Sequence, residues 1–368
     1  MLPSQGTIVN LQALRFAAAL WVAFLHSQFF INAQADVWTL PRIFKVLQTA
    51  GFAGVDIFFV ISGAIMALTS RHLAPTLGNS VRFLLVRFAR IYTGWWPLFA
   101  LYWLGAATLG QTDGKSFVSS LLLLPVPLNQ YVTVVLWTLS FELYFYCAVA
   151  LLILLPKTWR VRFFAALLLA LACATAIWHG QGHFTPAREA ESWPWQGFVA
   201  FPLIGEFLAG FLLYEWYVRT RPTRALPWAL GATVFFGLAV IYQKFVGKPT
   251  GASLDGFYGA PERALLLGGF AVCAVALALI ARPIRGRLAV ALVHLGDASY
   301  AIYLSHIMVF YALAQLLPVV GWPTRWYLPT LIVMLAAVTL FSRLYQRWIE
   351  GPLYRLCRHQ IRQRLALV

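Results

Sequence analysis

Runs of about twenty apolar residues recur along this 368-residue chain, and they constrain its fold more than any other feature. A helix that crosses the hydrocarbon core of a bilayer needs about 20 predominantly apolar residues. Ten runs of roughly this length are separated by polar or charged breaks. The sequence therefore predicts an all-α, polytopic integral membrane protein with about ten transmembrane helices. The predicted spans are 9–31, 49–70, 91–110, 131–155, 161–179, 196–217, 226–243, 262–281, 288–316 and 327–349.

The composition excludes an ordinary soluble protein. Hydrophobic residues make up 61% of the chain and charged residues 11%, whereas about a quarter of an average soluble domain is charged. A net charge of +16 would suit a nucleic-acid-binding protein if a soluble fold gathered the basic residues on one face. Here they lie between apolar runs, so we expect membrane lipids and no nucleic acid as partners. The four cysteines lack the spacing of a disulfide framework or of a metal site.

The distribution of Lys and Arg predicts the orientation. If the N-terminus is cytoplasmic, nineteen of the 28 Lys and Arg lie on the cytoplasmic side and seven on the opposite side. Because cytoplasmic loops carry the excess of these residues, we expect both termini in the cytoplasm. Residues 1–352 would form a single transmembrane domain and residues 353–368 a basic cytoplasmic tail. The stretch Ser116–Leu128, broken by Pro125 and Pro127, is predicted to be interfacial or re-entrant.

Ionisable side chains within the predicted spans are candidates for function, because a bilayer disfavours each of them unless it meets a partner or a cavity. Arg15 and His26 are eleven residues apart, which places them about 20° apart around a helix and about 16 Å apart along it. Arg15 could hold an anion, and His26, deeper in the membrane, could act as a general base. A snorkelling arginine and a histidine bonded to a backbone carbonyl would explain the pair equally well.

Four further residues have two interpretations each: the pair Arg87 and Arg90, Glu142, and Asp56. Arg87 and Arg90 lie on neighbouring helix faces near the cytoplasm, where they suit either a phosphate clamp or contacts with anionic lipids. Glu142 lies in an aromatic-rich span and is expected to pair with an arginine or to support a histidine. Asp56 lies six residues before Ser62, in a segment whose glycines allow close helix packing. It is either a charge at the membrane interface beside these glycines or part of a pocket.

The ninth predicted span carries a polar stripe. Ser299, Tyr303 and His306 follow one another at offsets of four and three residues, so they share one helix face. The stripe indicates either hydrogen bonding between helices or a surface that lines a substrate pocket. A soluble nucleophile arrangement finds no support, because no Gly-x-Ser-x-Gly elbow occurs.

The order and spacing of these motifs resemble membrane acyltransferase family 3, specifically the branch that O-acetylates bacterial exopolysaccharides and O-antigens. One departure is Thr93-Gly94-Trp95-Trp96-Pro97, where the family usually has a proline two or three residues after the second arginine. The resemblance rests on Arg15-x10-His26, Gly-Val-Asp56-Ile-Phe-Phe-Val-Ile-Ser62-Gly63, Arg87-x-x-Arg90, Trp137-Thr-Leu-Ser-Phe-Glu142-x-x-Phe-Tyr146, Gly296-x-x-Ser299-Tyr300-x-x-Tyr303-x-x-His306 and Glu350-x-Pro352.

The resemblance implies an acyl-coenzyme A donor in the cytoplasm, a glycan acceptor and no metal. By matched position, His26 would deprotonate a sugar hydroxyl, and Arg15 would hold the donor or orient the site, with Glu142 as the third catalytic residue. Arg87 and Arg90, together with Arg15, would bind coenzyme A. The implied substrate pocket consists of Asp56, Ser62, Trp137, Ser299, Tyr300, Tyr303 and His306.

The expected function is therefore transfer of acetyl from acetyl-coenzyme A to a hydroxyl of a surface or exported polysaccharide, free or lipid-linked, at the bacterial inner membrane. One alternative is a proton-coupled carrier or flippase in which Arg15, His26 and Glu142 form a proton relay. Another is an acyltransferase with a different acyl group or acceptor. The sequence leaves the oligomeric state open.

Overall fold

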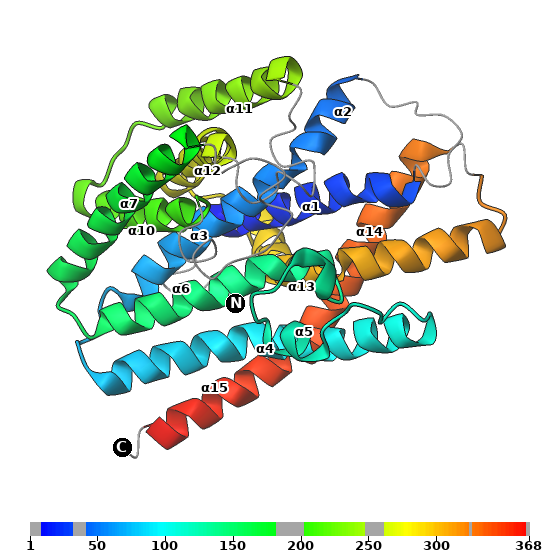
Figure 1. Ribbon diagram of the computed structural model, residues 1–368, viewed down its shortest axis with the longest axis horizontal. Coiled ribbons are helices and arrows are strands. Elements are labelled where there is room, and N and C mark those ends of the chain that lie inside the picture. Colours follow the sequence, from blue (N-terminus) through cyan, green and yellow to red (C-terminus); the bar gives the residue numbers. More distant parts are fainter. Residues whose placement is uncertain (1–8, 32–41, 182–201, 247–260, 324–325, 366–368) are drawn as a thin grey trace.

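The computed structural model describes residues 9–31, 42–181, 202–246, 261–323 and 326–365. Within these ranges the regular structure is entirely helical, which confirms the all-α prediction for the described part of the chain (Figure 1). The helices are α1 Val9–Ile31, α2 Arg42–Thr49, η1 Ala50–Phe52, α3 Ala53–Ser70, α4 Leu77–Thr108, α5 Phe117–Leu122, η2 Leu128–Gln130, η3 Val134–Leu136, α6 Trp137–Ile153, α7 Lys157–Gly180, α10 Ile204–Thr220, α11 Leu226–Val246, α12 Pro261–Ile280, α13 Gly286–Val319, α14 Tyr327–Tyr345, η4 Gln346–Glu350 and α15 Gly351–Leu365.

Each predicted apolar run overlaps one long helix. Among the described residues, eight helical segments are long and apolar enough to cross a membrane by length and composition. Two other helices, α4 and α10, also overlap predicted runs, but α4 carries three arginines in its first half and the described part of α10 has 17 residues. The helices agree with a polytopic membrane protein.

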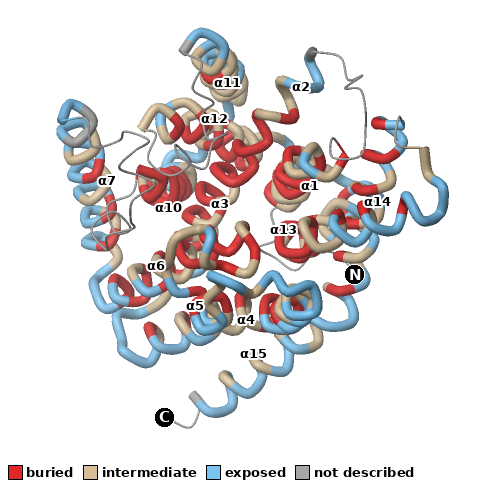
Figure 2. Tube along the Cα trace, turned by 45° about the vertical axis from the view of Figure 1, so that its right-hand side comes forward, coloured by how far each residue is buried: buried red, intermediate tan, exposed pale blue. Residues whose placement is uncertain are grey.

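The outer helices present apolar side chains outward. On α11, Leu226, Leu230, Val234 and Phe245 are all more than half exposed. Figure 2 shows α7 and α11 at the rim of the molecule, largely exposed, around the buried helices α1, α3 and α10. A soluble protein rarely exposes so large an apolar surface, so these faces fit contact with lipid chains.

The centre of the bundle is built by close helix contacts. A Cβ atom on Gly54 of α3 would lie 2.5 Å from the Ala18 backbone oxygen of α1. A Cβ atom on Gly296 of α13 would lie equally close to the Gln12 backbone oxygen. Small residues allow such approaches between membrane helices. They hold α3 and α13 against α1, the helix that carries Arg15 and His26.

The segment around Pro97 does not interrupt α4, which runs as one helix from Leu77 to Thr108. The short helix α5, within the predicted interfacial or re-entrant stretch, packs along α4. The indole nitrogens of Trp95 and Trp96 donate to the backbone oxygens of Ser120 and Leu121 at 2.8 and 3.2 Å. The departure from the family pattern therefore leaves the helix after Arg90 intact.

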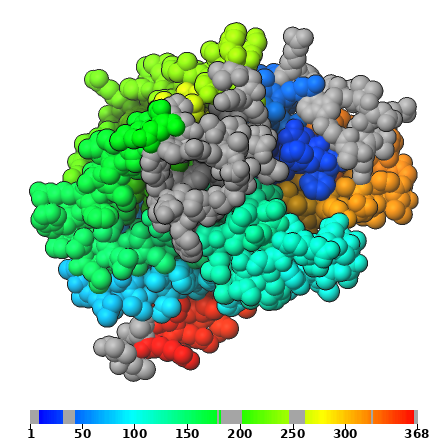
Figure 3. All heavy atoms as spheres, viewed as in Figure 1, coloured from blue at the N-terminus to red at the C-terminus, as the bar shows by residue number. Residues whose placement is uncertain are grey.

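At the C-terminal end, the chain continues as a helix across the expected domain boundary at residue 352. A five-residue π-helical turn, η4, joins α14 to α15. Helix α15 then runs along α4 and contacts it. Figure 3 shows α15 in red at the edge of the molecule, beside the light-blue start of α4.

Candidate active site

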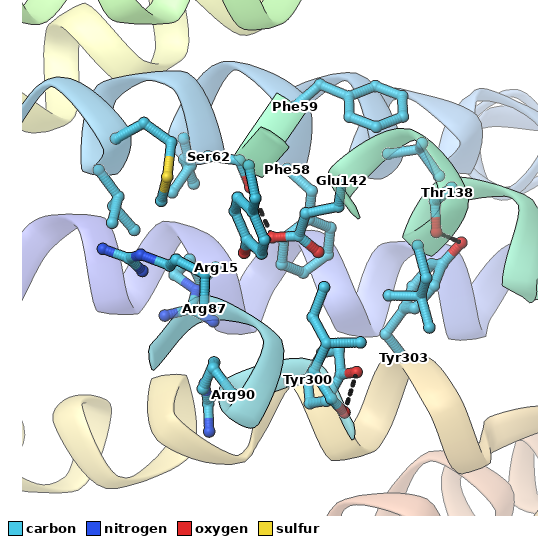
Figure 4. Close-up of a pocket in the computed structure, with 17 residues that line it drawn as sticks. Arg15, Phe58, Phe59, Ser62, Arg87, Arg90, Thr138, Glu142, Tyr300 and Tyr303 are labelled. Carbon is cyan, nitrogen blue, oxygen red and sulfur yellow. Dashed lines mark hydrogen bonds between the residues drawn. The ribbon is translucent and has the colours of Figure 1, made fainter. Parts of the chain in front are cut away.

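A cavity of about 160 Å³ lies between five helices in the interior of the bundle (Figure 4). Helices α1, α3, α4, α6 and α13 all contribute side chains to its wall. Three arginines gather at one end, a Thr138–Tyr303 pair marks the other, and Glu142 lies between them. The lining consists of Arg15, Val55, Phe58, Phe59, Ile61, Ser62, Ile65, Met66, Arg87, Arg90, Ile91, Thr138, Leu139, Glu142, Tyr146, Tyr300 and Tyr303.

The three arginines are held in different ways. Arg87 donates to the Thr69 hydroxyl at 2.7 Å and lies over the Phe83 ring. Arg90 forms a salt bridge with the buried carboxylate of Glu350. Arg15 donates to the side-chain oxygen of Gln12 at a long 3.4 Å. Because a guanidinium has five N–H donors, Arg15 and Arg87 retain donors that an anion entering this end could use.

Glu142 presents a carboxylate to the middle of the cavity. Its Oε1 atom accepts a hydrogen bond from the Ser62 hydroxyl at 3.3 Å and another from the Tyr146 hydroxyl one helical turn later. Both partners are neutral hydroxyl groups, and three arginines line the same cavity. Ser62, which was predicted for the pocket, thus lies next to Glu142, which was predicted to be catalytic.

Two tyrosines of α13 complete the wall. The Tyr300 hydroxyl donates to the Ile91 backbone oxygen at 3.0 Å, and its ring lies below the Arg90 guanidinium. The Tyr303 hydroxyl accepts from Thr138 at 2.9 Å. It also lies 3.2 Å from the Val135 backbone oxygen, to which it donates. These bonds fix both rings in the wall of the cavity; Tyr303 belongs to the predicted polar stripe, and Tyr300 lies beside it on α13.

His26 and His306 lie outside the lining of this cavity and contact each other instead. The His26 Nδ1 and His306 Nε2 atoms are 2.8 Å apart, and the two rings are nearly parallel, with centroids 4.9 Å apart and planes at 21° to each other. The His306 ring is fully buried, whereas His26 is half-buried. The Tyr303 ring, which lines the cavity, lies 6.0 Å from the His306 ring. The histidine pair is therefore adjacent to the tyrosine end of the cavity, away from the arginines.

Asp56, Trp137 and Ser299, which were also predicted for the pocket, lie outside the lining of this cavity. Asp56 forms a buried, bidentate ion pair with Arg263 of α12, with N–O distances of 2.9 and 3.2 Å. Trp137 packs edge to face against Phe59. Ser299 donates to the Gly296 backbone oxygen within its own helix. The Asp56 ion pair joins two helices and agrees with the packing interpretation of that position, whereas the Ser299 hydrogen bond stays within α13.

Sequence reasoning missed two ionic partners. The sequence patterns above do not single out Arg263, although an arginine inside an apolar span requires a partner such as Asp56. Glu350 appeared only as part of the final motif, and the structure places its fully buried carboxylate against Arg90. Arg263 could have been found as an ionisable group inside a predicted span, whereas Glu350 lies just past the end of the last one.

Comparison with known proteins identifies the family. Residues 8–345 match the family model described as an acyltransferase domain. The chain belongs to acyltransferase family 3. It is 31% identical to the exopolysaccharide production protein ExoZ of Rhizobium meliloti (strain 1021) over 329 residues, covering 83% of this chain and 90% of that protein. It is 24% identical to nodulation protein 10 of Rhizobium leguminosarum bv. viciae over 391 aligned positions, covering 99% and 98%. No solved structure shows significant similarity to it.

Membership of acyltransferase family 3 makes this chain a multi-pass membrane acyltransferase. Acyl transfer to a hydroxyl requires a place for an activated donor and a base that removes the hydroxyl proton. Within the described residues, the arginine-lined cavity and the adjacent histidine pair are an arrangement that can meet both requirements.

Proposed function

We propose that this protein transfers acetyl from cytoplasmic acetyl-coenzyme A to a hydroxyl of a bacterial surface or exported polysaccharide, at the inner membrane. The family supports acyl transfer, and similarity to an exopolysaccharide production protein supports a polysaccharide acceptor. The observation that carries the proposal is the cavity itself, with guanidinium groups at one end and a histidine pair next to the other.

The donor binds with its phosphates at the arginine end. Arg15 and Arg87 supply guanidinium donors, which suit phosphate oxygens in number and geometry. Arg90, held by Glu350, adds positive charge and supports the Tyr300 ring. The pantetheine arm then follows the cavity past Glu142 toward Tyr303, in the direction of His26, about 16 Å along α1 from Arg15.

The chemistry requires one base and no covalent enzyme intermediate. His26 takes the proton of the acceptor hydroxyl, and the oxygen attacks the carbonyl carbon of the thioester. The carbon–sulfur bond breaks, its electron pair leaves with sulfur, and the coenzyme A thiolate takes the proton from His26. The products are the O-acetyl ester and free coenzyme A. Glu142 orients the guanidinium of Arg15 that it faces.

The size of the cavity favours a small acyl group. About 160 Å³ is well below the roughly 300–1,000 Å³ of pockets that enclose drug-sized ligands. Phe58, Phe59 and Tyr303 contribute aromatic rings to its wall. A cavity of this size supports a small acyl group such as acetyl.

The base is tested with His26→Gln in purified protein, measuring acetyl transfer and acetyl-coenzyme A binding side by side. General acid–base catalysis contributes about 10²–10⁴-fold, so transfer should fall by that factor while donor binding survives. The control is His294→Gln, which changes an exposed histidine on α13. Turnover of His26→Gln within a few fold of the parent would contradict the proposed base, and absence of acetyl-coenzyme A binding in the parent would favour a carrier.

The donor end is tested with Arg87→Gln and, as a matched control, Arg82→Gln. Arg82 is exposed on the same helix and outside the cavity lining. Arg90 is unsuitable, because its removal would leave the buried Glu350 carboxylate without its ion-pair partner. A lost charge-assisted hydrogen bond is worth about 1.5–3 kcal/mol, so Arg87→Gln should weaken acetyl-coenzyme A binding by about tenfold or more. Equal affinities of the two variants would move the phosphate site elsewhere.

A further inference from the structure

His306 is a fully buried histidine whose two ring nitrogens both have partners. Its Nδ1 atom lies 2.7 Å from the Tyr303 backbone oxygen and 3.2 Å from the Ile302 backbone oxygen. Its Nε2 atom lies 2.8 Å from Nδ1 of His26. His306 therefore connects the backbone of α13 to the imidazole of α1.

The partners determine where the hydrogens are. A neutral imidazole has one N–H donor and one acceptor nitrogen. The two backbone oxygens beside His306 Nδ1 can only accept, so this nitrogen must carry the hydrogen. The Nε2 atom of His306 is then an acceptor. His26 Nδ1 must donate to it, because two facing lone pairs would form no hydrogen bond.

We propose that His306 is a positioning residue that fixes His26 in the tautomer whose Nε2 atom carries the free lone pair. The inference rests on the proposed function of His26 as base, and it assigns the reacting atom. His306 does not touch the acceptor or the donor. It acts through His26, as the partner of the Nδ1–H group.

The arrangement also accommodates the proton that His26 receives. When Nε2 takes the hydroxyl proton, His26 becomes an imidazolium whose Nδ1–H still donates to His306 Nε2. Hydrogen bonds from an ionised donor are stronger than neutral ones, so the intermediate is held better than the resting state. The nearly parallel rings of His26 and His306 and the edge contact of His306 with Phe310 hold this geometry.

Two substitutions of similar polarity separate positioning from packing. In His306→Gln, the longer side chain can donate to the Tyr303 oxygen and still present an acceptor to His26 Nδ1. In His306→Asn, the amide reaches the backbone oxygen but not His26. We expect His306→Gln to keep kcat within about tenfold of the parent. His306→Asn should lower kcat by about 10²-fold or more, with an unchanged KM for acetyl-coenzyme A.

A purely structural role predicts a different result. Both variants would then lose thermal stability, and the protein that remains folded would turn over at the same rate in each. Equal kcat values for folded His306→Gln and His306→Asn would therefore overturn the proposal.

The tautomer is tested independently of activity by NMR of protein with ¹⁵N-labelled histidine, with the His26 signals assigned from their loss in His26→Gln. The expected spectrum shows His26 protonated at Nδ1 and unprotonated at Nε2. Protonation at Nε2 in the parent would overturn the proposal. The expected spectrum together with an active His26→Gln variant would instead refute the proposed base while leaving the tautomer assignment standing.

Discussion

Two buried ion pairs join different helices of the bundle. Asp56 of α3 pairs with Arg263 of α12, and Arg90 of α4 pairs with Glu350 at the end of η4. A buried charge without a partner is strongly destabilising. Arg15 differs, because its hydrogen bond to Gln12 is long and its guanidinium lines the cavity. At the residue scale, this contrast between paired and available arginines distinguishes structural charges from the proposed donor site.

Gly94 has no side chain, and this leaves room for the Tyr300 ring. A Cβ atom at Gly94 would lie 2.5 Å from the Tyr300 ring and 3.4 Å from the Glu350 carboxyl carbon. Gly94→Ala should therefore displace the ring and lower the free energy of unfolding by about 1–3 kcal/mol, the usual cost of overpacking. Gly105→Ala on the same helix meets open space and should be neutral or stabilising by up to about 1 kcal/mol. Thermal unfolding in detergent measures both. Equal melting temperatures would show that the ring adjusts freely.

At the element scale, Arg160 connects three helices through their ends. Its guanidinium donates to the backbone oxygens of Ser70, Leu73, Ile153 and Leu155 at 2.8–3.0 Å. The last carbonyls of a helix have no partner within the helix, and a buried arginine satisfies several of them here. The ends of α3 and α6 are thereby held against the start of α7.

Arg160→Met should remove this connection. Four carbonyls would lose a charged donor, so we expect the free energy of unfolding to fall by about 3 kcal/mol or more. Protease cleavage in the turn between α6 and α7 should become faster. Arg162→Met, which makes the same change at an exposed position two residues later, is the control. A stability loss no larger than that of the control would mean that the carbonyls find other donors.

At the scale of the whole molecule, side-chain contacts join helix ends at two opposite sides of the bundle. Arg160 connects the ends of α3 and α6 to the start of α7, and Lys157 lies 3.7 Å from Glu215 near the end of α10. On the opposite side, Gln48 of α2 donates to the Tyr327 hydroxyl at the start of α14. The ends of α3, α6 and α10 and the start of α7 adjoin loops on the side that carries most of the basic residues.

The positive charges then predict which side is cytoplasmic. Reporters fused near Arg71, Lys157, Arg221 and Arg285 should score cytoplasmic, and reporters near Arg42, Gln181 and Lys248 should score exterior. A systematic inversion would contradict the orientation and place the arginine end of the cavity on the wrong side for a cytoplasmic donor. A mixed pattern would instead contradict the number of crossings.

Much of the architecture could be predicted because membrane helices follow a local rule. An apolar run of the right length forms a helix wherever it lies in the chain, since the bilayer leaves no other way to satisfy its backbone. The same rule indicated which ionisable residues inside the spans were unusual, and three of them, Arg15, His26 and Glu142, now line or adjoin one cavity. Arg87 and Arg90, which were predicted from their spacing near the cytoplasm, line the same cavity.

Only the tertiary structure decided which of these residues meet. Arg15 and His26 share a helix, yet one faces the cavity and the other faces His306, 280 positions later. Asp56 finds Arg263 across 207 positions, and Arg90 finds Glu350 across 260. Hydropathy sums over neighbours in sequence and carries no information on such distant pairs. Which residues pair depends on which helices lie close together. Close contacts such as Gly296 against Gln12 exist only in the assembled bundle.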